Sequence, residues 1–242
     1  MKNSLTISSA VLTALAIAAT VAPIAASADS TSSTSWSSTG TVAFTSPSTG
    51  TTPPNITDPS NPGTTPNPGL PSQPGNFAID YASNLDFGSH TISATAKTYY
   101  ANLDAKATAA GYSGANFVSI HDLRGVATGW TLSVTQAAQF TSGTSNLTNA
   151  AITFNYGKGI NSGGGTEQPT ATSTFTLTPG TAQAVMSDST GIVGNYAAQY
   201  GSASYYKGTE TGGPISLYIP SGAVQATSYT STLNWNLAAV PS

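Results

Sequence analysis

The feature that most constrains the fold is an alternation of apolar and polar side chains with a period of two, which recurs from residue 76 onward. Side chains two apart in a strand project to one face, so the alternation predicts strands with one buried face. Glycine-rich connections separate these segments. We therefore predict an all-β fold, an antiparallel β-sandwich or Greek-key barrel-like single domain with little helix. The clearest alternating segments are 77–81, 130–134, 152–156, 175–177, 215–219 and 229–237.

Helical patterns are few and short. Residues 101–110 could form a short helix, and residues 181–186 a single turn, but neither carries a longer apolar stripe.

The chain begins with a predicted secretory signal peptide at residues 1–28. It combines Lys2, a short apolar run broken by polar residues and Pro23, and the small-x-small sequence Ala26-Ser27-Ala28. Next come a Ser/Thr-rich segment at 29–45, with one candidate strand at 41–45, and a Pro-rich linker or long loop at 46–75. The predicted β domain occupies 76–242. No later apolar run could span a membrane and no sorting motif ends the chain, so we expect the folded domain itself to retain the protein at the surface.

Composition excludes several classes of protein. The chain has no cysteine, so its core, from about 165 residues, has to stabilise it without disulfides. Without the signal peptide, five basic residues face nine acidic ones, for a net charge of −4. The basic residues are scattered, which excludes nucleic acid as a partner, because binding it requires clustered Lys and Arg. Because the chain is itself negatively charged, contact with an anionic surface polymer would have to rest on hydrogen bonds and stacking and not on ion pairs. The basic residues are Lys97, Lys106, Arg124, Lys158 and Lys207.

Catalytic and metal-binding patterns are weak. Ser119 and His121 share a strand face, but in a Ser-rich chain this spacing is more often a coincidence than a catalytic pair. A glycan hydrolase would need two convergent carboxylates, such as Asp80 and Asp122, and the sequence does not show that they converge. Two distant histidines and no cysteine predict no metal site, and we expect no cofactor. We predict a protein that is not an enzyme.

Two Trp-x-Leu elements remain, Trp130-Thr131-Leu132 in VATGWTLSV and Trp235-Asn236-Leu237 in YTSTLNWNLAAVP. In chain order there are a signal peptide, a Pro/Thr-rich spacer, FAIDYASNLDFG, FVSIHDLRGVATGWTLSV with the first motif, LTNAAITF, and the terminal run with the second motif. In this order the elements resemble the WxL surface family of low-GC Gram-positive bacteria, and the resemblance covers the mature chain. One departure is that GIVGNYAAQYGSASYY supplies tyrosines where a further tryptophan is expected.

The resemblance implies a secreted cell-surface protein that attaches non-covalently to the cell wall, with peptidoglycan as the ligand. Other cell-surface proteins are possible partners. One alternative is that the domain docks onto another surface protein through a strand edge and reaches the wall indirectly. A secreted glycan hydrolase is the second alternative.

Three sets of residues are candidates for the site. Trp130, Leu132, Trp235 and Leu237 would either bind ligand or form core, since both pairs lie in runs of inward-facing residues. Asp122, Arg124 and Gly125 would support the first motif, with an ion pair between the first two that favours a structural role for the arginine. The third set is a possible aromatic platform for glycan, formed by Tyr196, Tyr200, Tyr205, Tyr206 and Tyr218.

Overall fold

The computed structural model describes residues 39–45, 57–63 and 73–240. The predicted signal peptide lies outside these residues. The chain divides into two compact units, Met1–Ala43 and Phe44–Ser242, and the fold described here is that of the second.

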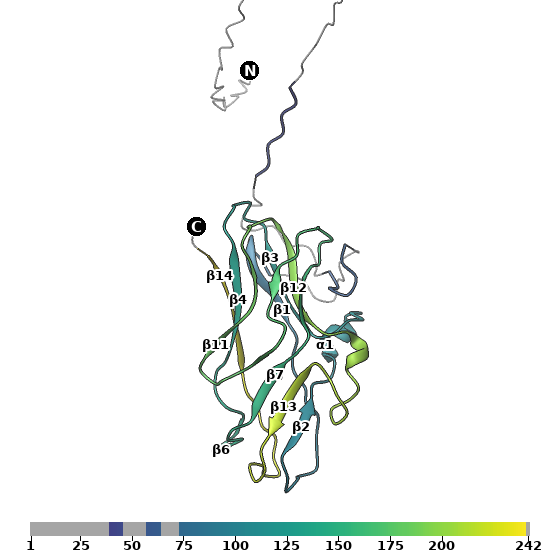
Figure 1. Ribbon diagram of the computed structural model, residues 1–242, viewed down its shortest axis with the longest axis vertical. Coiled ribbons are helices and arrows are strands. Elements are labelled where there is room, and N and C mark those ends of the chain that lie inside the picture. The colour runs from purple at the N-terminus through teal and green to yellow at the C-terminus, as the bar shows by residue number, and fades with distance from the viewer. Residues whose placement is uncertain (1–38, 46–56, 64–72, 241–242) are drawn as a thin grey trace, which may run out of the picture. The chain divides into compact units, whose positions relative to one another are not determined.

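The second unit is built from antiparallel strands in three four-stranded sheets and one small hairpin (Figure 1). The β1 sheet has the order β1 (Phe77–Ala82), β3 (Phe117–Asp122), β12 (Gly194–Tyr200) and β8 (Gly157–Asn161). The β14 sheet has the order β14 (Leu233–Ala239), β4 (Trp130–Gln136), β11 (Ala182–Asp188) and β9 (Thr170–Ala171). The β13 sheet has the order β10 (Phe175–Thr176), β7 (Ala151–Phe154), β13 (Ile215–Ile219) and β2 (Lys97–Tyr100), and the hairpin pairs β5 (Thr141–Ser142) with β6 (Ser145–Asn146). The prediction of an all-β, sandwich-like fold is confirmed, and the sheets do not close into a barrel.

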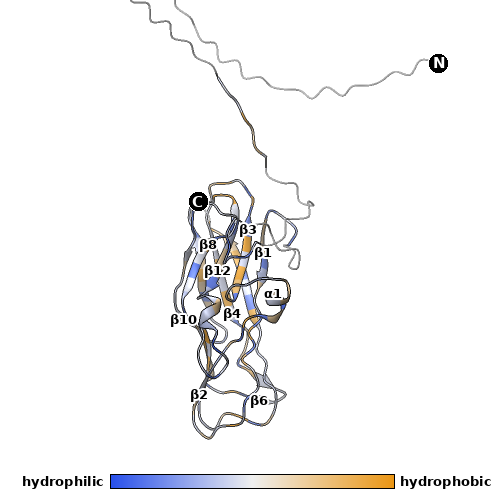
Figure 2. Cartoon of the chain, turned by 90° about the vertical axis from the view of Figure 1, so that its right-hand side faces the viewer, coloured by the Kyte–Doolittle hydropathy of each residue, from blue (hydrophilic) through white to orange (hydrophobic). Residues whose placement is uncertain are grey.

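One main core joins the three sheets. The Trp130 ring of β4 lies 5.4 Å from the Tyr196 ring of β12, and the Phe154 ring of β7 lies 4.8 Å from that of Tyr200. Hydrophobic residues, drawn in orange, are concentrated on β3 and β4 (Figure 2). In β4 every second residue is buried, as the alternation predicted.

Helix is scarce in the described segments. The helix α1 (Ala105–Ala109) lies within the predicted 101–110 and begins where the Asp104 side chain accepts a hydrogen bond from the Lys106 backbone N–H. The prediction of a helical turn at 181–186 is wrong, because this segment enters β11, where Ala182 pairs with Thr135 and Met186 with Leu132. No described helix is long and apolar enough to cross a membrane.

The candidate strand at 41–45 is not a strand in this structure. Its residues have no assigned secondary structure, and Val42 and Phe44 are 77% and 89% exposed. Alternation favours a strand, but a strand also needs a paired neighbour to satisfy its backbone groups.

Part of the predicted linker lies against the β domain. Thr57 and Pro59 are buried. The Gly63 N–H donates to the Ser162 carbonyl at 3.0 Å, and the Gln199 amide donates to the Ser60 hydroxyl at 2.6 Å. Residues 57–63 are therefore fixed to the domain by several contacts.

Candidate functional site

The first Trp-x-Leu motif forms part of the core. Trp130 and Leu132 lie on β4 and are completely buried. The Trp130 indole Nε1 has no hydrogen-bond partner in the described part of the chain. These two side chains cannot touch a ligand without unfolding of the sandwich, so their role in this structure is packing.

The second motif lies on the neighbouring strand β14. The register places Leu237 opposite Leu132, Trp235 opposite Val134 and Ala239 opposite Trp130. Both motifs therefore project to the same core, with their leucines paired in the middle. Trp235 and Leu237 are only half-buried, because β14 is the last strand of its sheet.

The backbone of the second motif faces a sheet edge at which no described strand is paired, and we call it the open edge. The Val240 N–H donates to the Gly129 carbonyl, and the Thr232 carbonyl accepts from the Ala137 N–H. In an antiparallel ladder alternate residues bond to the same neighbour, so the even-numbered residues of β14 bond to β4. The N–H and carbonyl groups of Leu233, Trp235, Leu237 and Ala239 therefore point away from β4.

The supporting motif holds the turn before β4. The Arg124 guanidinium contacts both oxygens of Asp122, at 2.9 and 2.7 Å, and also donates to the Thr128 carbonyl at 3.1 Å. Its Cζ lies 3.9 Å from the centre of the Phe77 ring. The hydrogen bonds to Asp122 raise the pKa of Arg124, and Gly125 has a positive φ of 66°. This geometry supports the structural interpretation of Arg124.

The five tyrosines do not form one platform. Tyr196 and Tyr200 are core residues of β12, and burial raises the pKa of Tyr196 to about 12 while its hydroxyl donates to the Ile192 carbonyl. Tyr206 donates to the Tyr200 carbonyl and is partly buried. Only Tyr205 and Tyr218 are exposed, and they lie on different elements, Tyr205 in a short 3-10 helix and Tyr218 on β13.

The buried histidine is held by acceptors at both ring nitrogens. His121 Nδ1 lies 2.8 Å from Asp80 Oδ1, and its Nε2 lies 3.1 Å from the Gly75 carbonyl oxygen. Burial acts to lower the pKa of His121, but the hydrogen bond and charge of Asp80 outweigh it and the pKa is raised. A ring that donates from both nitrogens cannot accept a proton from Ser119, so the geometry does not support a catalytic pair.

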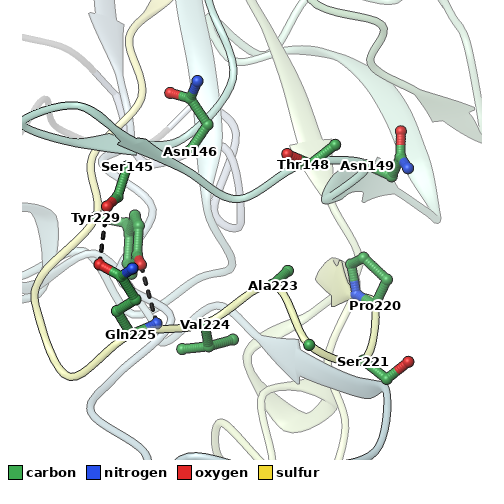
Figure 3. Close-up of a pocket in the computed structure, with 11 residues that line it drawn as sticks. Ser145, Asn146, Thr148, Asn149, Pro220, Ser221, Ala223, Val224, Gln225 and Tyr229 are labelled. Carbon is green, nitrogen blue, oxygen red and sulfur yellow. Dashed lines mark hydrogen bonds between the residues drawn. The ribbon is translucent and has the colours of Figure 1, made fainter.

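A pocket lies where the β5–β6 hairpin meets the loop after β13; we call it the loop-end pocket. Figure 3 shows the segment that follows β6 on one side and the loop after β13 on the other. The Ser145 hydroxyl donates to the Gln225 side chain at 2.8 Å, and the Gln225 N–H donates to the Tyr229 hydroxyl at 3.0 Å. The cavity has a volume of about 430 Å³, and its lining residues are Ser145, Asn146, Thr148, Asn149, Pro220, Ser221, Gly222, Ala223, Val224, Gln225 and Tyr229.

Among the described residues, no charged side chain lines the loop-end pocket. Its walls offer amide and hydroxyl groups beside the apolar surfaces of Pro220, Val224 and Tyr229. Amides and hydroxyls both donate and accept, so they suit a neutral ligand that carries hydroxyl and amide groups.

A second cavity adjoins the first and shares Pro220, Val224 and Tyr229 with it. Its lining includes the apolar side chains of Phe87, Phe140, Leu147, Leu217 and Ile219. On its outer side the His90 ring stacks on Tyr99 with centres 3.7 Å apart, and His90 Nδ1 lies 3.0 Å from Glu210 Oε1. The first cavity is lined in part by Ser145 and Asn146 of β6 and the second by Lys97 and Tyr99 of β2, and both strands lie at the same end of the domain (Figure 1).

The described strands form a β-sandwich-like domain in which the two Trp-x-Leu strands pair in one sheet. The family model described as WxL domain surface cell wall-binding matches residues 31–241, and the chain belongs to this family. It is thus a cell-surface protein with a cell wall-binding domain. No curated protein and no solved structure matches the chain.

The residues that line the loop-end pocket were not predicted from the sequence. The sequence carried only a general signal for this site: Asn146, Asn149 and Gln225 lie in polar loops, where binding residues often occur. Nothing in their spacing showed that the 145–149 segment and the loop after β13 would meet, because this contact depends on the tertiary fold.

Proposed function

We propose that the exported protein attaches non-covalently to Gram-positive cell wall by binding peptidoglycan, and that the loop-end pocket contacts the glycan. The absence of charged side chains from the pocket lining carries this proposal. The amino sugars of peptidoglycan present hydroxyl and acetamido groups, which match the amides of Asn146, Asn149 and Gln225. The half-buried Tyr229 adds an aromatic surface against which a sugar can pack.

Sedimentation of the purified protein with protein-stripped cell wall tests the proposal. The wild type is expected to sediment at both low and high salt, because binding that does not rest on ion pairs is not screened. Asn146→Ala combined with Asn149→Gly is expected to weaken binding about tenfold, through the loss of two amide contacts. Glycine at 149 retains the positive φ of 60° found there.

The matched control is Asn234→Ala, which removes an exposed asparagine from β14, outside the pocket lining. This variant is expected to bind wall like the wild type. A wild type that is folded by circular dichroism but stays in the supernatant would overturn the proposal of direct wall binding. If the pocket variant and Asn234→Ala bind wall equally well, the loop-end pocket does not contribute to wall binding.

Docking onto another surface protein is the second candidate function, and the open edge of β14 favours it. The outward N–H and carbonyl groups of Trp235 and Leu237 could accept a strand from a partner. The low density of charged residues does little to block such pairing, since charged side chains are a common protection of sheet edges. The substitution Ala239→Pro removes an outward N–H group of this edge and therefore separates this function from direct wall binding.

The hydrolase alternative has no support in the positions of Asp80 and Asp122. Asp80 is buried against His121, and Asp122 is buried and paired with Arg124. Both carboxylates are engaged by internal partners.

A further inference from the structure

Tyr156 has a backbone conformation that its residue type disfavours. It connects β7 to β8, where the chain passes from the β13 sheet to the β1 sheet, and its φ is +57°. The other described residues with positive φ are glycines and Asn149. Glycine adopts this conformation without steric cost and asparagine tolerates it, whereas a bulky aromatic residue is a genuine outlier there.

Neighbouring hydrogen bonds fix this conformation. The Gly201 N–H donates to the Tyr156 carbonyl at 3.0 Å, and the Gly157 N–H donates to the Ser173 carbonyl at 2.9 Å. A Cβ atom at Gly157 would lie 2.4 Å from the Thr172 carbonyl oxygen, so the backbone just after Tyr156 packs closely against a neighbouring segment. The fold thus requires the turn but does not require tyrosine in it.

The Tyr156 side chain is not used for packing in the core. It is 62% exposed and makes an edge contact with Tyr205, whose ring centre lies 5.2 Å away and which is 47% exposed. A Cβ atom at Gly201 would lie 2.8 Å from Cδ2 of Tyr205, so glycine at 201 leaves room for this ring. Next to Tyr205, the exposed Ser202 and Ser204 hydroxyls lie 2.8 Å apart.

We propose that Tyr156 and Tyr205 form a second glycan contact, in which a neutral pyranose ring stacks on the Tyr156 face beside the hydroxyls of Ser202 and Ser204. This proposal rests on the proposed function of wall binding and adds a site outside the loop-end pocket. Strained backbone conformations cluster at active sites and ligand-binding sites. Exposed aromatic faces attract the apolar face of a sugar, and two contacts on one polymer strengthen its retention.

The variant Tyr156→Gly tests the contribution of this side chain to binding separately from its contribution to folding. Tyr156→Gly relieves the backbone strain, so we expect a thermal midpoint equal to or above that of the wild type. We also expect about five- to tenfold weaker binding to protein-stripped wall and to a soluble N-acetylglucosamine oligomer, because one stacking face is lost. Tyr205→Ala is the second variant, with weaker binding expected and a folded circular dichroism spectrum.

Tyr218→Ala is the matched control, since it removes another exposed tyrosine, on β13. It is expected to bind like the wild type. If the wild type binds wall and both Tyr156→Gly and Tyr205→Ala bind it equally well, the second contact is overturned while wall binding stands. If the wild type itself binds neither probe, the proposed function fails, and this inference fails with it.

Discussion

Trp130 and Trp235 occupy equivalent places in the two Trp-x-Leu motifs, yet only Trp130 is completely buried. We expect Trp130→Ala to lower the free energy of unfolding by about 3–5 kcal/mol, as is usual when a buried aromatic side chain is removed. Trp235→Ala is expected to cost roughly half as much, because its side chain already contacts solvent. Chemical denaturation of the two variants measures both values.

Trp130→Phe is the control for this comparison. It retains an aromatic ring beside Tyr196 and removes an indole N–H that has no described partner. This variant is expected to be folded and to sediment with wall like the wild type. A Trp130→Ala protein with wild-type stability that fails to bind wall would contradict the assignment of Trp130 to the core.

The buried pair of His121 and Asp80 predicts a dependence of stability on pH. The pKa of His121 in the folded state is raised above the unfolded value of about 6.5, so the folded state binds the imidazole proton more tightly than the unfolded state does. The stabilisation is therefore complete below pH of about 6.5 and is lost as the pH rises through the folded pKa. The groups that favour the charged ring are Asp80, Asp122 and the Gly75 carbonyl.

Denaturation between pH of about 5 and 9 tests this prediction. We expect the free energy of unfolding to fall with rising pH in the wild type and to lose this dependence in His121→Asn. The His90→Gln variant keeps His121 and is expected to keep the dependence. A wild type whose stability rises across this range would show that the sign is wrong.

At the scale of the strand, β14 offers a comparison between adjacent alanines. The Ala238 N–H faces β4, whereas the Ala239 N–H faces the open edge. We expect Ala238→Pro to destabilise the domain by about 1–3 kcal/mol through a lost ladder hydrogen bond. Ala239→Pro is expected to change stability little, because edge positions tolerate proline.

The same pair of variants tests docking through the β14 edge. If a partner protein adds a strand to β14, Ala239→Pro is expected to abolish its binding while leaving stability and direct wall binding unchanged. A surface protein from the same cell that binds both wild type and Ala239→Pro equally would exclude this edge as its docking site.

The strands that the sequence predicted best are those with one buried face. In β4 and β13 the two-residue period was visible because each has a core face and a more exposed face. β3 and most of β12 are buried on both faces and therefore show little alternation. The prediction of a helical turn at 181–186 was wrong because Ala, Gln and Met favour helix, whereas the pairing of β11 with β4 decides the conformation.

The candidate site was harder to predict than the fold. The Trp-x-Leu motifs identified the family but mark the core and the sheet edge. The tyrosines Tyr196 and Tyr200 were assigned to a platform because the sequence does not show that β12 is buried on both faces. Tyr156 was missed as a site residue because a positive φ at a non-glycine residue has no sequence signature.

At the scale of the whole chain, residues 57–63 attach part of the proline-rich segment to the β domain through Asp58. Its carboxylate accepts from the backbone N–H groups of Ser60 and Ser113, at 2.8 and 3.1 Å. Gly114 allows the close approach, since a Cβ there would lie 1.7 Å from the Ser60 hydroxyl oxygen. Substitutions at Asp58 or Gly114 are therefore expected to weaken the attachment of this segment.

We expect each of the single variants Asp58→Ala and Gly114→Ala to loosen residues 57–63. A protease of broad specificity should then cut this segment faster than in the wild type. The control Asp86→Ala removes a carboxylate that accepts from the Gly88 N–H in another loop, and its cleavage at 57–63 is expected to be unchanged. Mass spectrometry of timed digests measures the cleavage.

Because the loop-end pocket lies within residues 145–229, the cleaved domain is still expected to sediment with wall. Loss of sedimentation after a cut at 57–63 would mean that the N-terminal part of the chain takes part in wall binding.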